Sequence, residues 1–178
     1  MKTHTPHSIP SSAAAAAIAH VIYLEGGESN DPADNGGHTR FGISASAHPE
    51  VDIAALTRKK AEQIYYQHYW SALQCDVYHP AVGFVLFDMG VNQGVSFAAK
   101  VLQSWVGATP DGIVGPKTLA LAVAMPPSET IQHLTDKRLL RYANLVKYDA
   151  FQNKFIVGWL TRAITVRIAA SKLLEITT

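Results

Sequence analysis

The sequence predicts a mostly α-helical protein of one domain, with roughly six to eight helices. Apolar residues recur with the helical period of about 3.6, whereas the alternation typical of strands is scarce and no β-hairpin is indicated. A length of 178 residues suits a single domain. Hydrophobic residues make up 48% of the chain and charged residues 16%, which is enough apolar surface for a buried core.

The first expected helix covers the alanine-rich run from Ala13 to Leu24. Alanine is the strongest helix former, and Ser11 or Ser12 is placed to cap the helix. The run is too short to cross a membrane, which takes about 20 apolar residues. It also lacks the cationic start and the cleavage site of a signal peptide, so none is expected.

A glycine-rich segment from Gly26 to Gly42 follows this helix, and His48-Pro49 marks a turn after it. The second helix is expected within Thr57–Trp70. Four of its residues share one face at helical spacing: Ala61, Ile64, Tyr65 and His68.

Residues 81–107 form the longest helical segment after a connector that ends at Pro80. Gly90 and Gly94 lie inside this segment, where they allow either close packing or a break. Turn residues at 110–112 then precede a short helix.

The last three helices are expected to start near Lys117, at Ser128 and at Phe155. Ser128 is the residue type that caps a helix, and the segment that it begins extends to residue 149. The final segment, 155–177, is helical by its apolar period.

Two ligand sites that glycine-rich loops form in other proteins are excluded by spacing. An EF-hand needs oxygen ligands at its odd early positions and a closing Glu, but Ala33 and Gly42 occupy two of these positions when Gly36 is the loop glycine. The G-x-x-x-x-G-K-[ST] phosphate loop is absent. We therefore expect no metal ion and no cofactor.

The polar residues of the segment suit hydrolysis of a glycosidic bond. Glu25 ends the first helix, Asp34 follows nine residues later, and Thr39 follows five after that. Glycosidases commonly use two carboxyl groups, one kept protonated by apolar surroundings and one ionised. Phe41 is among the apolar neighbours expected for Glu25, and the Thr39 hydroxyl can help to hold an attacking water.

Each of these residues also has a structural interpretation. A Glu at a helix end before two glycines is most often a solvated surface charge, and Asp34 alone is most often a turn residue. Spacing alone favours these structural interpretations over catalysis.

One extended pattern between residues 25 and 44 favours catalysis over the structural interpretations. Its members are Glu25, Gly26, Gly27, Asn30, Asp31, Pro32, Asp34, Gly36, Gly37, Thr39, Gly42, Ile43 and Ser44. The pattern resembles the signature of the glycoside hydrolase family 108 muramidases, E-G-G-x-x-N-D-P-x-D-x-G-G-x-T-x-x-G-I-[ST]. Four later segments are similar to family motifs: Tyr69-Trp70, the D-x-x-V-N-x-G of 88–94, a peptidoglycan-binding-like region at 101–119, and the G-W-x-x-R of 158–162.

The resemblance implies a lysozyme-like α fold that cleaves the β-1,4 bond between N-acetylmuramic acid and N-acetylglucosamine in peptidoglycan. It implies one lysozyme-like domain over residues 1–178. Within it we expect a glycoside hydrolase part at 12–90, a peptidoglycan-binding-like helical part at 91–165 and a flexible start at 1–11.

The resemblance also implies roles for single residues. Glu25 is the general acid, and Asp34 is either the base that activates water or a stabiliser of the transition state. The Glu-Asp-Thr order is similar to the triad of phage-type lysozymes, whose second spacing is one residue longer, so the role of Thr39 stays open. The expected substrate-binding residues are Asn30, Gly37, Phe41, Asn92 and Gln93.

Downstream residues have two interpretations. Asn92 and Gln93 either line the glycan cleft or have a structural role, in a buried hydrogen bond or at a helix break at Gly90 and Gly94. Asp88 is expected to be structural. Core packing is favoured over sugar stacking for the three tryptophans, Trp70, Trp105 and Trp159.

Charge and cysteine content limit the partners. A formal charge of +1 does not suit nucleic-acid binding, and the single Cys75 excludes an internal disulfide. The basic last helix, with Arg162, Arg167 and Lys172, either makes weak contact with an envelope membrane or, as we favour, is an ordinary solvated face. The expected partner is the glycan strand of peptidoglycan, bound by a monomer.

A phage or prophage endolysin is the first functional hypothesis. We expect such a lysin to be made in the cytoplasm of the bacterial host, without a clear signal peptide, and to act in the periplasm and cell wall. The alternatives are a non-catalytic peptidoglycan-binding or secretion-accessory protein, and a lytic transglycosylase, which needs only one Glu.

Overall fold

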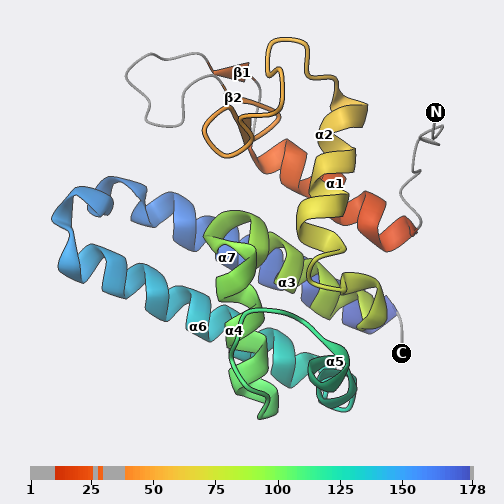
Figure 1. Cartoon of the computed structure of the whole chain (residues 1–178). Coiled ribbons are helices and arrows are strands. Elements are labelled where there is room, and N and C mark those ends of the chain that lie inside the picture. Colours follow the sequence, from red (N-terminus) through yellow and green to blue (C-terminus); the bar gives the residue numbers. More distant parts are fainter. Residues whose placement is uncertain (1–10, 26–27, 30–38, 177–178) are drawn as a thin grey trace. The chain divides into compact units, whose positions relative to one another are not determined.

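A computed structural model describes residues 11–25, 28–29 and 39–176 of the chain. Residue contacts divide the chain into two compact units, Met1–His68 and Tyr69–Thr178. The described part contains seven α-helices and three two-residue strands, so the predicted mostly α fold is confirmed (Figure 1). The expected flexible start, 1–11, lies outside the described residues except for Ser11.

The first unit is built on two helices, α1 (Ser12–Glu25) and α2 (Arg58–Tyr65). The Ser11 hydroxyl accepts a hydrogen bond from the Ala14 backbone N–H at 3.1 Å, which confirms the predicted cap of α1. Thr57 caps α2 in the same way through the Lys60 backbone N–H. The buried face of α1 consists of Ala14, Ala17, Ile18, Val21 and Ile22.

A small antiparallel sheet in the first unit was missed by the sequence prediction. It consists of β1 (Glu28–Ser29), β2 (Thr39–Arg40) and β3 (Ile43–Ser44), in that order. Phe41 and Gly42 join β2 to β3 with φ values of 53° and 76°, the positive values that a two-residue hairpin turn of type I′ needs. Strands of two residues are too short to show an alternating pattern, so periodicity could not reveal them.

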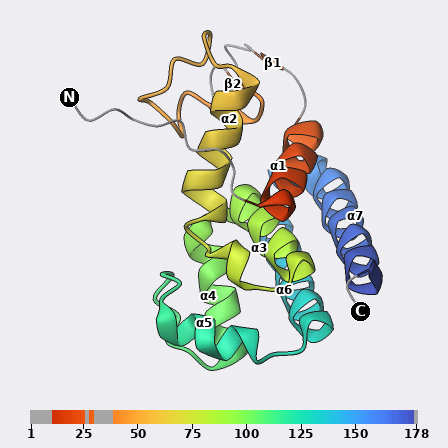
Figure 2. The same cartoon turned by 90° about the vertical axis from the view of Figure 1, so that its right-hand side faces the viewer.

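Helix α3 (Pro80–Gln93) is the central element of the second unit. All ten residues from Ala81 to Gly90 are buried, as expected of a helix covered on every side. It packs against α4 (Val95–Val106), α6 (Pro127–Tyr148) and α7 (Asn153–Ile176) (Figure 2). Four shorter helices remain: the π-helix η1 (Tyr66–Trp70), the 3-10 helices η2 (Cys75–Val77) and η3 (Ala150–Gln152), and the α-helix α5 (Pro116–Val123). The boundary between the two units falls within η1.

The two glycines inside the predicted 81–107 helix serve the two expected purposes, one each. Gly94, with φ of 94°, breaks the segment between α3 and α4. A Cβ at Gly90 would lie only 2.6 Å from Cδ1 of Leu73, so this glycine permits close packing.

The start of α6 corrects the prediction of a Ser128 cap. The helix begins at Pro127, the cap position is Pro126, and no side chain caps it. Proline suits the first helical position because its missing N–H would have no partner there. Helices α6 and α7 then form an antiparallel hairpin through η3, and α7 begins at Asn153, two residues before the predicted start.

Gln103 holds the turn that follows α4. Its side chain is 1% exposed, and its Nε2 donates to Asp111 Oδ1 at 2.7 Å and to the Ile113 carbonyl at 2.9 Å. Its Oε1 accepts from the Gly112 backbone N–H at 2.9 Å. One buried amide therefore satisfies three groups of the turn.

Replacing Gln103 with Leu is expected to destabilise the protein by about 2–3 kcal/mol, because buried polar groups of the turn lose their partner. Urea unfolding measures the change. Gln132→Leu, on the exposed side of α6, is the matched control and is expected to change stability by less than about 0.5 kcal/mol. Equal effects of the two substitutions would contradict the role of Gln103.

Candidate functional site

Glu25 is the last residue of α1 and is exposed. The turn between β2 and β3 lies directly against its stem: a Cβ added to Gly42 would be 2.6 Å from both Cβ and Cγ of Glu25. Only a glycine fits this approach, and the positive φ of Gly42 favours glycine as well. The turn therefore limits where the Glu25 side chain can go.

The apolar surroundings expected for Glu25 are only partly present. Tyr23, two residues earlier on α1, is 82% exposed, and Phe41 is half-buried in the turn. Glu25 itself is exposed, so the apolar burial that the sequence suggested for it is not seen.

Tyr65 supports the turn from the side of α2. Its ring is 1% exposed, and its hydroxyl donates to the Phe41 carbonyl at 3.0 Å. The same hydroxyl would be 2.5 Å from a Cβ at Gly42. Sequence reasoning placed Tyr65 on the core face of its helix without a role, although a buried tyrosine hydroxyl normally needs a hydrogen-bond partner.

Thr39 and Phe41 belong to the same hairpin as Gly42. Thr39 lies on the central strand, where it pairs with Ser29 on one side and Ser44 on the other. The Arg40 guanidinium lies 5.5 Å from the centre of the Phe41 ring. Three further predicted site residues, Asn30, Asp34 and Gly37, lie outside the described residues.

Asn92 and Gln93 lie in the last turn of α3, in the second unit, and both are half-buried. The Tyr142 hydroxyl donates to Asn92 Oδ1, and Gln93 Nε2 lies 3.5 Å from the Arg138 carbonyl. Both side chains therefore make the hydrogen bonds of the structural interpretation. Their substrate contacts stay a prediction.

Asp88 is the centre of a buried charge cluster in the second unit. It is 0% exposed, and its carboxylate lies 2.5 Å from Arg138 Nη1 and 2.8 Å from Arg162 Nη2. A buried carboxylate needs such partners because its desolvation costs several kcal/mol. These ion pairs support the predicted structural role of Asp88. Arg162 belongs to this buried cluster and not to the exposed basic face that the sequence suggested.

Arg138 extends the cluster toward Asn92. Its Nε donates to the Tyr142 hydroxyl at 2.7 Å, and that hydroxyl donates onward to Asn92. Burial raises the pKa of Tyr142, so the hydroxyl keeps its proton for this bond. The arrangement fixes the side chain of Asn92 from the core.

The three tryptophans differ in their surroundings. Trp70 is 1% exposed and meets Phe87 edge to face at 5.5 Å, so it is a core residue as predicted. Trp105 stacks on His133 at 4.5 Å, and Trp159 stacks on Tyr142 at 5.1 Å; both tryptophans are half-buried. Trp159 also stacks on Phe155, with ring centres 5.8 Å apart. Sugar stacking stays the alternative prediction for Trp105 and Trp159.

The described residues contain no group of three or more His, Cys, Asp or Glu side chains arranged to hold a metal ion. No helix among them combines the length and the apolarity that a membrane crossing requires.

Two family models match consecutive parts of the chain. Residues 18–94 match glycosyl hydrolase 108, and residues 97–164 match a predicted peptidoglycan domain. The chain is also 33% identical to SagA of Brucella abortus in a solved structure, with a TM-score of 0.78 over 90% of this chain and 94% of that one. The chain belongs to glycoside hydrolase family 108. A comparison with curated proteins found no match.

Membership of the family makes the chain a peptidoglycan hydrolase with a peptidoglycan-binding region. The first match contains Glu25, the hairpin of Gly42 and Tyr65, while the second contains α4 to α6 and the first half of α7. The predicted single domain with parts at 12–90 and 91–165 stays a prediction.

Replacing Gly42 with Ala is expected to lower peptidoglycan hydrolysis at least about tenfold and to destabilise the protein by about 1–3 kcal/mol, because the methyl group collides with Glu25 and Tyr65 at a strained φ. Gly158→Ala is the control, since nothing lies within 4 Å of a Cβ inside α7 there. That change is expected to stabilise by about 0.5–1 kcal/mol. Rates of peptidoglycan clearing and thermal unfolding measure both variants; a fully active, equally stable Gly42→Ala protein contradicts the packing role.

Proposed function

We propose that the chain is an N-acetylmuramidase, which cleaves the β-1,4 bond between N-acetylmuramic acid and N-acetylglucosamine with Glu25 as general acid. The observation that supports this most is the exposed Glu25 at the end of α1, with its stem packed against the Gly42 turn inside the family-108 match. A general acid must reach the glycosidic oxygen, and positioning of its side chain is part of its efficiency.

The second carboxylate of the proposal is Asp34, either as the base that activates water or as a stabiliser of the oxocarbenium-like transition state. The separation of the two carboxyl groups decides between inversion and retention. Thr39 would hold the attacking water, and the expected glycan contacts are Asn30, Gly37, Phe41, Asn92 and Gln93. This chemistry uses protein side chains and water alone.

The biological setting follows from the substrate. Peptidoglycan strands are the partner, and hydrolysis takes place in the periplasm and cell wall. An endolysin made in the cytoplasm of a bacterial host and active as a monomer is the setting that we propose.

The identity of the cleaved bond is tested on the fragments that the enzyme releases from purified peptidoglycan. Borohydride reduces the sugar at each new reducing end to its alditol, and the reduced amino sugar is then identified. A muramidase yields muramitol, because each cut creates a reducing N-acetylmuramic acid end. Glucosaminitol as the main product would make the enzyme a glucosaminidase and overturn the proposed bond specificity.

A further inference from the structure

Positive charge is concentrated on the hairpin of α6 and α7. Residues 137–174 contain eight Lys and Arg and a single acid, Asp149, although the whole chain has a formal charge of only +1. The other acids of α6 and α7 lie outside this stretch: Glu129, Asp136 and Glu175. Arg138 and Arg162 are committed to Asp88 in the core. The other six are exposed or half-exposed: Lys137, Arg141, Lys147, Lys154, Arg167 and Lys172.

Asp149 is occupied by local hydrogen bonds between the two helices. Its Oδ1 accepts from the Phe151 backbone N–H at 3.0 Å, and its Oδ2 accepts from Gln152 Nε2 at 2.8 Å. The carboxylate therefore caps η3. Between Asp136 and Glu175, six exposed or half-exposed cations are accompanied by this one acid.

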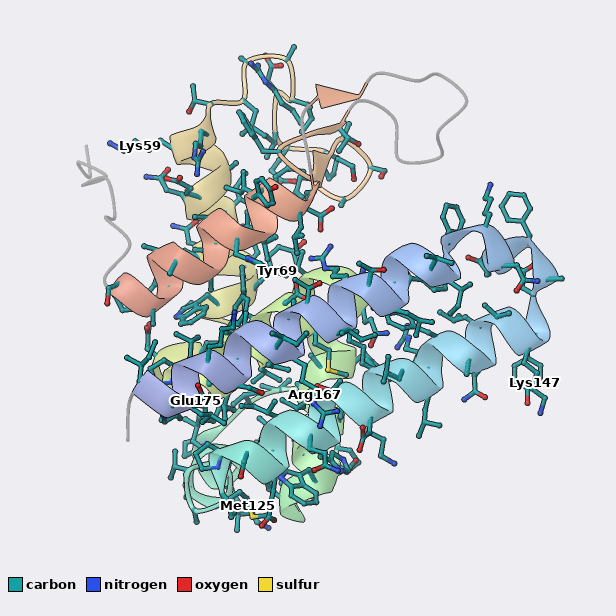
Figure 3. The ribbon with its side chains drawn as sticks, turned by 180° about the vertical axis from the view of Figure 1, so that it is seen from behind. Lys59, Tyr69, Met125, Lys147, Arg167 and Glu175 are labelled. Atoms are coloured by element: carbon teal, nitrogen blue, oxygen red, sulfur yellow. The ribbon has the colours of Figure 1, made fainter. Side chains whose placement is uncertain are left out.

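The end of the hairpin also exposes aromatic rings beside its lysines. Tyr148 is 81% exposed and Phe151 is 66% exposed. Lys154 Nζ lies 3.7 Å from the centre of the Phe151 ring, and Lys147 Nζ lies 5.4 Å from that of Tyr148. Figure 3 shows Lys147 near the end of α6 that leads into α7, directed away from the helices.

An apolar stripe continues from this end along α7. Val157, Leu160, Ile164 and Ile168 recur every three or four residues and are all exposed, which places them on one face of the helix. Arg167 and Lys172 lie on the same helix. A helix with an apolar stripe and Lys or Arg beside it is typical of proteins that lie in the interface of a membrane.

We propose that the α6–α7 hairpin, residues 137–174, binds the surface of an anionic lipid bilayer. Aromatic rings and long cationic side chains are the groups that settle among lipid headgroups, and each Lys or Arg near the surface strengthens the attraction to anionic lipid. The apolar stripe would enter the boundary between headgroups and acyl chains.

A glycan strand and a second copy of the chain are less complementary to the hairpin surface than an anionic bilayer is. A hydrated glycan strand offers little to bury the aliphatic stripe, and the stripe and Lys172 extend past residue 164, where the peptidoglycan match ends. Two hairpins of this chain in contact would repel each other through their cations. An anionic bilayer satisfies both the charge and the apolar surface.

Co-flotation with vesicles tests the proposal on the full chain. The protein is expected to float with phosphatidylcholine vesicles that contain phosphatidylglycerol, to remain unbound with phosphatidylcholine alone, and to be released as salt increases. The double substitution Lys147→Gln with Lys154→Gln is expected to lower vesicle affinity at least about tenfold. Tyr148→Ser with Phe151→Ser is expected to do the same.

The matched control variants replace exposed lysines and an exposed apolar residue outside the hairpin. Lys59→Gln with Lys60→Gln removes two exposed lysines of α2, and Ile113→Ser removes a 74% exposed apolar side chain after α4. Both are expected to float like the parent protein. All these positions are exposed, so each variant is expected to unfold at the same temperature as the parent protein. Thermal unfolding of every variant checks this.

Four results would overturn the proposal. The parent protein does not float with phosphatidylglycerol vesicles, or the control variants lose as much binding as the hairpin variants. The hairpin variants keep vesicle binding but no longer sediment with purified peptidoglycan, which assigns the hairpin to the wall. A concentration-dependent dimer that Tyr148→Ser with Phe151→Ser abolishes assigns it to a second copy. Borohydride analysis of the products is independent of all four results.

Discussion

Replacing Glu25 with Gln is expected to slow peptidoglycan hydrolysis by a factor of about 100 to 10,000, because the amide has the same shape but no proton to donate to the leaving oxygen. The residue is exposed, so the substitution should leave the fold intact. The measurement is the rate at which purified peptidoglycan releases soluble fragments.

Glu129→Gln is the matched control for this prediction. Glu129 is an exposed acid in the first turn of α6, in the second unit, and no part of the proposed chemistry depends on it. Its variant is expected to keep the parent rate within about twofold. A Glu25→Gln protein that retains more than about a tenth of the parent rate would contradict the role of Glu25 as general acid.

Replacing Arg138 with Met is expected to destabilise the protein by about 3–5 kcal/mol, the usual cost of removing one partner of a buried ion pair. Arg138 is 2% exposed, and its loss leaves Asp88 with Arg162 alone and deprives the Tyr142 hydroxyl of its donor. Urea unfolding at neutral pH measures the change.

The pair of Arg58 and Glu62 on α2 provides the control. Arg58 Nε lies 3.0 Å from Glu62 Oε1, but the arginine side chain is 59% exposed, so Arg58→Met is expected to cost less than about 1 kcal/mol. A loss of stability no larger for Arg138→Met than for Arg58→Met would show that the Asp88 cluster does not hold the second unit together.

Features with local signals were predicted well from the sequence. Helical periodicity indicated roughly six to eight helices, and the described residues contain seven. Ser11, one of two predicted caps, caps α1, and Gly94, one of two glycines that could break the long segment, divides α3 from α4. Each of these depends on residues a few positions apart, whose preferences act before any tertiary contact forms.

Errors arose where local signals competed or were too short. Ser128 has the side chain of a cap, but Pro126-Pro127 precede it and begin the helix one residue earlier. The hairpin around Phe41 and Gly42 has strands of two residues, which no period can reveal.

The contacts that position the functional side chains join residues far apart in the sequence. Tyr65 bonds to Phe41 across 24 residues, and Asp88 meets Arg138 across 50 and Arg162 across 74. No pattern of neighbouring residues in the sequence predicts such pairs. The candidate acid Glu25 came from the family signature, while its contact with Gly42 required the structure.

The central claim, that Glu25 is the general acid of a hydrolytic muramidase, is tested most directly by mass spectrometry of the soluble products of purified peptidoglycan. The parent protein and Glu25→Gln are compared side by side. The account predicts fragments with reducing N-acetylmuramic acid ends from the parent and almost none from the variant. Fragments with 1,6-anhydro ends would instead identify a lytic transglycosylase, and equal release by both proteins would remove Glu25 from the mechanism.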